Sequence, residues 1–144
     1  MDYDAFISYS HAADGRLAPA LQRALKSLAK PWFRLRALSV FRDQTDLSAA
    51  ADLTAAIRAA LANSRFFVYL ASPAAARSHW VGAEIEAWRR RQRPNQLLIA
   101  LPDGDIAWSD ATGDFAWDRS SALHPCLKGV FDKEPLWVDL RWGS

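Results

Sequence analysis

The stretch that decides the fold is Phe66-Phe67-Val68-Tyr69-Leu70-Ala71, followed shortly by Ser78-His79-Trp80-Val81-Gly82-Ala83-Glu84-Ile85-Glu86. The first run is apolar without alternation, which is typical of a strand buried on both faces. In the second, Val81, Ile85 and Trp88 recur at helical spacing, and Ser78 stands where an N-cap is expected. We therefore predict a buried strand followed by a helix with one apolar face.

The same alternation of strand and helix runs outward along the chain. Strands are predicted over 3–9, 38–41, 66–71, 97–101 and 136–140, and helices over 17–28, 53–61 and 80–88. The first, third and fourth strands are nearly continuous apolar runs, which favours a parallel sheet covered by helices. We expect a flavodoxin-like, doubly wound α/β fold whose five-stranded parallel sheet has the order 2-1-3-4-5.

Length and composition indicate one globular domain over residues 1–144, since 51% of the residues are hydrophobic and 24% are charged. The connection 102–135 before the last strand is long and irregular, with a short helix expected over 120–131, and such connections are often functional or bind a partner. The sequence shows no pattern for the last helix of a doubly wound fold after Leu140. We therefore expect a domain cut from a longer multidomain protein, or one completed by another chain.

Several classes of partner are not expected. No apolar run has membrane-spanning length and no basic-then-apolar leader is present, so we expect a cytoplasmic protein that binds no membrane. The single cysteine, Cys126, is interpreted as a packing residue in a reducing compartment. Net charge is +2, and the one dense basic cluster, Arg89, Arg90, Arg91 and Arg93, is interpreted as a solvated helix end. Nucleic-acid binding is therefore not expected.

Several chemistries are excluded by missing motifs. The sequence has no Gly-rich phosphate loop, no cluster with metal-ligand spacing and no Gly-x-Ser-x-Gly elbow. The paired acids of a phosphoacceptor receiver domain are replaced by Ser-Tyr-Ser-His after the first strand. We expect neither a metal nor a resident cofactor.

A candidate site lies where the strand order reverses, because open α/β sheets bind ligands beyond the carboxyl ends of their strands. The residues expected to meet there are Tyr9, Ser10, His11, Arg42, Asp43, Asp46, Trp80 and Glu84. Six of them also have a structural interpretation: a helix cap for His11 and Ser10, core packing for the two aromatic residues, and a surface ion pair for Arg42 and Asp43.

The two glutamates of the 80–88 helix can be distinguished. Glu84 lies at the edge of the apolar face between Trp80 and Trp88, so we expect a partly desolvated acid without a local partner. It is either functional or a structural acid that the helix dipole favours. Glu86 faces away and precedes Arg90 by one turn, which predicts a solvated ion pair worth a few tenths of a kcal/mol.

Three motifs, in order, resemble the Toll/interleukin-1 receptor (TIR) domain family. They are Tyr3-Asp4-Ala5-Phe6-Ile7-Ser8-Tyr9-Ser10, then Val40-Phe41-Arg42-Asp43, then Ser72-Pro73 with Trp80-Val81-Gly82-Ala83-Glu84-Ile85. The resemblance covers about residues 2–101 and resumes weakly at 137–140. Two stretches depart from it: Ser48-Ala49-Ala50-Ala51 replaces a glycine-containing loop, and Ser10-His11 replaces arginines that enzymatic members often carry.

The resemblance implies one of two functions. Bacterial and plant members often cleave NAD between nicotinamide and ribose, with the glutamate that matches Glu84 as the catalytic residue. Other members, chiefly animal receptors and adaptors, only assemble through TIR–TIR contacts. For this chain the resemblance implies a signalling or defence protein, with innate immunity and antiviral defence as the expected settings. The resemblance thus favours an NAD nucleosidase, with NAD as substrate and activation by self-association. The alternatives are a non-catalytic interaction module and a nucleoside deoxyribosyltransferase-like enzyme.

Overall fold

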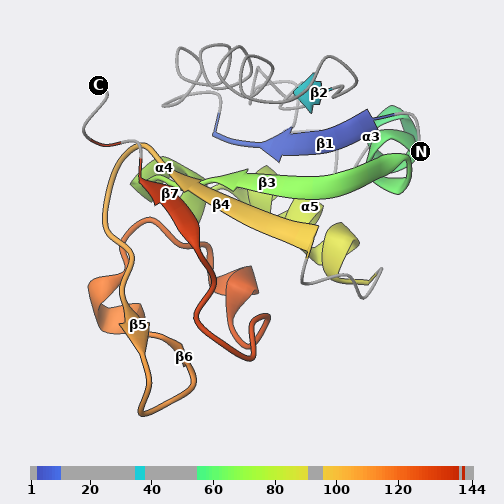
Figure 1. The fold of residues 1–144 in the computed structure, drawn as a ribbon. Coiled ribbons are helices and arrows are strands. Elements are labelled where there is room, and N and C mark those ends of the chain that lie inside the picture. The colour runs from blue at the N-terminus through green and yellow to red at the C-terminus, as the bar shows by residue number, and fades with distance from the viewer. Residues whose placement is uncertain (1–2, 11–34, 38–54, 91–95, 140, 142–144) are drawn as a thin grey trace.

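The centre of the molecule is a parallel sheet of five strands in the order β2-β1-β3-β4-β7 (Figure 1). The computed structural model describes residues 3–10, 35–37, 55–90, 96–139 and 141. The strands are β1 (Tyr3–Ser8), β2 (Leu35–Ala37), β3 (Ser64–Leu70), β4 (Leu97–Leu101) and β7 (Trp137–Asp139). Every neighbouring pair is parallel. The predicted fold class and strand order are confirmed.

The second strand differs most from its predicted position. β2 pairs through Leu35–Ala37 with Ala5–Ile7 of β1. The residues predicted for it, 38–41, lie outside the described part of the chain. By contrast, β4 occupies the predicted residues 97–101. The continuous apolar run of β4 identifies it, whereas the short edge strand β2 has no such pattern.

Two helix starts are fixed by serine side chains. The helices are α3 (Ala55–Ala62), α4 (Pro73–Ala76) and α5 (His79–Arg89). Ser72 Oγ accepts from the Ala75 amide at 3.0 Å, and Ser78 Oγ accepts from the Val81 amide at 3.1 Å. Each satisfies an amide at a helix start that lacks an intrahelical partner. The predicted cap at Ser78 is thus confirmed, while the helix predicted over 17–28 lies outside the described residues.

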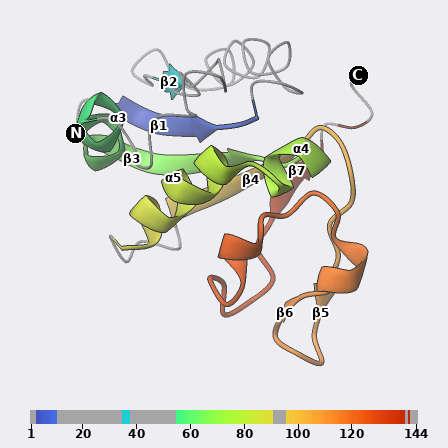
Figure 2. The same cartoon turned by 180° about the vertical axis from the view of Figure 1, so that it is seen from behind.

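The apolar face of α5 packs across the middle of the sheet (Figure 2). Trp88 lies against Phe67 of β3, with ring centroids 5.6 Å apart, and Phe67 stacks on Phe6 of β1 at the same distance. All three side chains are fully buried. Burial of such a side chain contributes about 1.5–3 kcal/mol to the free energy of unfolding. This aromatic column fixes α5 relative to β1.

The long connection between β4 and β7 is part of the core. It contains an antiparallel pair, β5 (Trp108–Ser109) and β6 (Asp114–Phe115), and 3₁₀ turns at Trp117–Arg119 and Pro125–Leu127. Tyr69 of β3 donates its hydroxyl proton to the Ala122 carbonyl at 2.6 Å. The helix predicted over 120–131 is wrong: this stretch holds one 3₁₀ turn, and its apolar side chains pack beside α5.

Two large apolar side chains are exposed on the opposite face of β4 and β7. Ala100 pairs with Val138, so Leu98, two residues before Ala100, lies on the same face as Val138. Leu98 is 45% exposed and Val138 is 60% exposed. Within the described residues, no helix follows β7. None of the described helices has the length and apolar character needed to cross a membrane.

Candidate active site

Glu84 is held at the carboxyl end of β1. Its side chain is 1% exposed, and the hydroxyl of Ser8, the last residue of β1, donates to Glu84 Oε1 at 2.6 Å. The predicted lack of a local partner on the helix is confirmed, but the side chain is almost completely buried rather than partly desolvated. Helix periodicity places Glu84 at the edge of the apolar face, but at this turn β1 covers that edge. The partner lies on a distant strand rather than on α5.

The second oxygen of this carboxyl group has no partner. Among the described residues, nothing forms a hydrogen bond to the buried Glu84 Oε2. Burial raises the pKa of Glu84 well above 4.5, and the hydrogen bond from Ser8 opposes that shift only in part. A buried acceptor without a partner costs free energy. Its presence at a strand end is typical of a group that receives a ligand.

Four of the predicted site residues can be placed. Tyr9 and Ser10 directly follow β1, and Ser10 is buried whereas Tyr9 is half-buried. Trp80 is buried one turn before Glu84, with its ring edge-on to His79 at 5.4 Å. The structure therefore brings the end of β1 and the start of α5 together at one edge. The remaining predicted residues, His11, Arg42, Asp43 and Asp46, lie outside the described part of the chain.

Glu86 is a surface residue, as predicted, but its partner is different. It pairs with Arg89 at 3.5 Å, not with Arg90, and its side chain is 44% exposed. Arg89 also donates to the Cys126 carbonyl at 2.9 Å, a tertiary contact that selects the i,i+3 pairing. Burial, with Glu86 beside it, raises the pKa of Cys126 to about 11. The thiol is therefore protonated at neutral pH, which agrees with a packing role.

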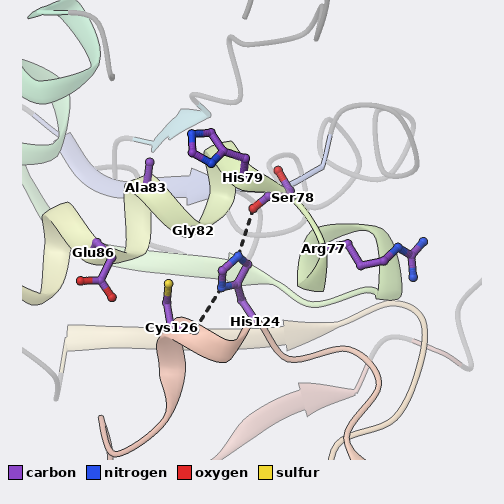
Figure 3. Close-up of a pocket in the computed structure, with 8 residues that line it drawn as sticks. All are labelled: Arg77, Ser78, His79, Gly82, Ala83, Glu86, His124 and Cys126. Atoms are coloured by element: carbon purple, nitrogen blue, oxygen red, sulfur yellow. Dashed lines mark hydrogen bonds between the residues drawn. The ribbon is translucent and has the colours of Figure 1, made fainter. Parts of the chain in front are cut away.

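A cavity of about 500 Å³ lies on the other side of α5 (Figure 3). Its lining residues are Arg77, Ser78, His79, Gly82, Ala83, Glu86, His124 and Cys126. His124 Nε2 lies 3.0 Å from the Ser78 carbonyl, and Nδ1 accepts from the Cys126 amide at 3.1 Å. These bonds favour a neutral ring with its proton on Nε2, and burial lowers the pKa of His124. Glu84 does not line this cavity.

Sequence reasoning missed Ser8 as the partner of Glu84. One signal was available. Residues i and i+2 of a strand share a face, and Phe6, two residues before Ser8, belongs to the apolar side. A hydroxyl on that side needs a buried hydrogen-bond partner. The contact between Gly82 and His124 was also missed, and a glycine inside a helical pattern was its signal.

The sequence matches the family described as TIR domain over residues 5–123. This chain belongs to the TIR domain family. It is 54% identical over 142 residues to the NAD(+) hydrolase ApTIR of Actinoplanes sp., a match that covers 99% of this chain and 20% of that relative. The TIR domain described here thus spans only a small part of that relative's length.

A solved structure has the same fold. It is that of the TIR domains in the activated Roq1 resistosome directly recognizing the pathogen effector XopQ, with a TM-score of 0.53. The two chains are 20% identical, and the match covers 72% of this chain and 59% of that one. This similarity supports the fold of the TIR domain.

Proposed function

We propose that this TIR domain cleaves NAD at the nicotinamide–ribose bond and releases nicotinamide together with ADP-ribose or a cyclic ADP-ribose. The observation that carries the proposal is the Glu84 carboxyl group, which is buried at the strand edge with Oε1 held by Ser8 and Oε2 free of described partners. The 54% identity to a protein named NAD(+) hydrolase supports this choice of substrate.

The chemistry needs one well-placed carboxylate. Nicotinamide leaves a cationic pyridinium as a neutral ring, so departure requires no general acid. The transition state resembles an oxocarbenium ion, as in glycoside hydrolysis. Ionised Glu84 stabilises the positive charge that develops at the anomeric carbon, and its free oxygen is available to a ribose hydroxyl. Attack by water then gives ADP-ribose, and attack by the adenine base gives the cyclic product.

The substrate itself favours the ionised form of Glu84. Burial alone shifts the carboxyl group toward its protonated state. A pyridinium cation within a few ångströms shifts it back, because an opposite charge stabilises the carboxylate. In this proposal, NAD binding therefore helps to prepare the charge that its own cleavage needs.

The remaining site residues are assigned to substrate binding. Tyr9, Ser10 and Trp80 lie at the edge that carries Glu84 and would contact the sugar or a base. Arg42 and Asp43, which match a family motif, complete the set together with His11 and Asp46, which the predicted strand order assigns to the same edge. Arg42 would meet the phosphates. No resident cofactor takes part in this scheme.

We further propose that activity depends on self-association within a larger signalling or defence protein in the cytoplasm. Innate immunity and antiviral defence are the settings that the family resemblance favours. The exposed Leu98 and Val138 on one sheet face support contacts with another chain or domain. Neither nucleic acid nor membrane is needed.

Nicotinamide release from NAD, followed by chromatography, tests the activity. We expect release by the wild type, a loss of about 10²–10³ in turnover for Glu84→Gln, and nearly unchanged turnover for the half-exposed control Glu86→Gln. If the wild type releases no nicotinamide at any concentration or degree of crowding, a non-catalytic interaction module is the better assignment. If it exchanges bases on deoxyribonucleosides but leaves NAD intact, the deoxyribosyltransferase-like alternative is the better one.

A further inference from the structure

Ser8 is a polar residue in an apolar strand. Its neighbour Ile7 and the residue paired with it, Tyr69 of β3, are both fully buried, as is Ser8 itself. A hydroxyl in such surroundings destabilises the fold unless it is hydrogen-bonded. The partner recorded for the Ser8 hydroxyl is Glu84 Oε1, which is itself buried. The Ser8 hydroxyl and Glu84 Oε1 thus satisfy each other across the interface of β1 and α5.

The geometry of this contact makes the two carboxyl oxygens unequal. The O–O distance of 2.6 Å is in the range of hydrogen bonds from a hydroxyl to a charged oxygen. Oε1 is therefore tied to the backbone position of β1, and Oε2 has no partner among the described residues. A hydrogen bond to one oxygen restricts rotation of the carboxyl group about its last torsion, and the second oxygen is left without a hydrogen bond from the described residues.

We propose that Ser8 is a positioning residue for the reaction, because its hydroxyl holds Glu84 Oε1 and so leaves Oε2 to face the ribose of the substrate. This inference rests on the proposed cleavage of NAD. Ser8 does not need to touch the substrate, since its hydroxyl proton is used by Glu84. It acts on the reaction through the orientation and ionisation of one carboxyl group.

Ser64 provides a matched control. It lies in β3, is fully buried and donates its hydroxyl to the Ala60 carbonyl at 2.7 Å. Replacing Ser8 or Ser64 by alanine therefore removes the same atom, from the same type of element, with a hydrogen bond of similar length. Only Ser8 contacts a group with a proposed role in the chemistry.

The experiment compares the wild type with Ser8→Ala, Ser8→Cys and Ser64→Ala in the full chain. Nicotinamide release gives kcat, KM and the pH dependence of kcat. Independently of NAD, the ionisation of Glu84 is followed by ¹³C NMR of isotope-labelled glutamate carboxyl groups, with Glu84→Gln to assign the signal. Melting curves report the folded state of each variant.

For Ser8→Ala we expect kcat to fall about 10- to 100-fold, the loss typical for a hydrogen bond to a charged group, with a smaller change in KM. The acidic limb of the kcat profile and the Glu84 titration should both move to higher pH, because the hydroxyl stabilises the ionised form. Ser8→Cys keeps the approximate volume and a weak hydrogen-bond donor. The pH profile of its kcat should therefore lie between those of the wild type and Ser8→Ala. Ser64→Ala should lower the melting temperature without moving the acidic limb of the pH dependence of kcat.

Two results would overturn the inference. The first is a folded Ser8→Ala variant whose kcat and acidic limb equal those of the wild type. The second is a Ser8→Ala variant that loses kcat while the acidic limb of its pH profile and the Glu84 titration stay where they are in the wild type. If Ser8→Ala does not fold, Ser8→Cys decides between the same outcomes. A wild type without nicotinamide release would refute the proposed function and, with it, the catalytic role of Ser8. The NMR titration would then still report whether Ser8 holds Glu84.

Discussion

Gly82 of α5 faces the imidazole ring of His124 so closely that a Cβ atom on Gly82 would lie 2.5 Å from His124 Cε1. The helix that carries Glu84 and the segment between β4 and β7 therefore meet at a point where only glycine fits. Glycine inside a helix costs about 1 kcal/mol relative to alanine. Glycine is needed here because the ring of His124 occupies the space that a side chain at position 82 would fill.

We predict that Gly82→Ala destabilises the domain although alanine is the better helix former. Overpacking costs about 1–3 kcal/mol, which exceeds or cancels the gain in helix propensity. Thermal melting of Gly82→Ala, His124→Ala and the double variant checks this. The double variant should be more stable than the sum of the single changes predicts, since removing the ring makes room for the methyl group. Strict additivity would contradict the contact.

The stability of Glu84→Gln should depend on pH in a defined direction. The pKa of Glu84 is raised in the folded protein above its ordinary 4.5, so the folded state holds a proton that the unfolded state releases first. Wild-type stability therefore falls as pH rises from 4.5 toward the folded-state pKa and then stays level. Glu84→Gln lacks this loss and should become the more stable protein over that range.

Denaturant unfolding of the wild type and Glu84→Gln at several pH values measures the effect. Glu86→Gln is the control, because Glu86 is half-exposed and should leave the slope with pH unchanged. A stability difference between wild type and Glu84→Gln that does not vary with pH would be inconsistent with a buried, proton-binding Glu84.

His124 should make the domain less stable in mild acid. Burial lowers its pKa below the ordinary 6.5. The hydrogen bond to the Ser78 carbonyl and the charge of Glu86 oppose this shift, and His79 assists it. The unfolded chain therefore takes up a proton before the folded one, and stability falls as pH decreases below 6.5 toward the folded-state pKa. Protonation would also remove the acceptor that Nδ1 offers to the Cys126 amide.

Unfolding curves of the wild type and His124→Gln across this pH range are the measurement. Because glutamine does not fill the space of the ring, His124→Gln should be less stable than the wild type at neutral pH. Because glutamine does not titrate, the variant should also lose part of the decrease in stability below pH 6.5. His79→Gln serves as the comparison, because that ring is exposed. If the stability of the wild type and of His124→Gln decreases equally below pH 6.5, a group other than His124 causes the acid sensitivity.

The rate of NAD cleavage per protomer should rise with protein concentration. The sheet face that carries Leu98 and Val138 exposes apolar surface, which association would bury. Activity measured over about a hundredfold dilution, with and without crowding agents, tests this. A Leu98→Lys, Val138→Lys double variant should lose the concentration dependence. A constant rate per protomer in the wild type would show that one chain is sufficient.

Much of the fold could be predicted because its signals are local. The continuous apolar runs of β3 and β4 and the helical spacing before Trp88 do not depend on distant residues. β2 was harder, because its pairing with β1 defines this short edge strand more than its own composition does. The choice between Arg89 and Arg90 as the partner of Glu86 was also hard, because both spacings allow a contact on a helix. The hydrogen bond from Arg89 to the Cys126 carbonyl favours the pairing of Glu86 with Arg89.

The environment of Glu84 could be predicted only in part. Helix periodicity correctly places it beside the apolar face, and strand order correctly places it at the carboxyl end of β1. Its complete burial depends on how closely β1 packs against α5, and the sequence of α5 carries no information on that distance. A search of β1 for a polar residue on its inward face would have found Ser8.

The hydrogen bond between Ser8 and Glu84 spans 76 positions of the chain. During translation the ribosome therefore releases β1 well before it makes the helix that completes the pair, and a prematurely terminated chain carries one half of the contact. Aborted and incompletely translated products would lack the assembled carboxyl site. In a cell, depletion of a central redox carrier by this domain would accordingly come from finished, folded molecules.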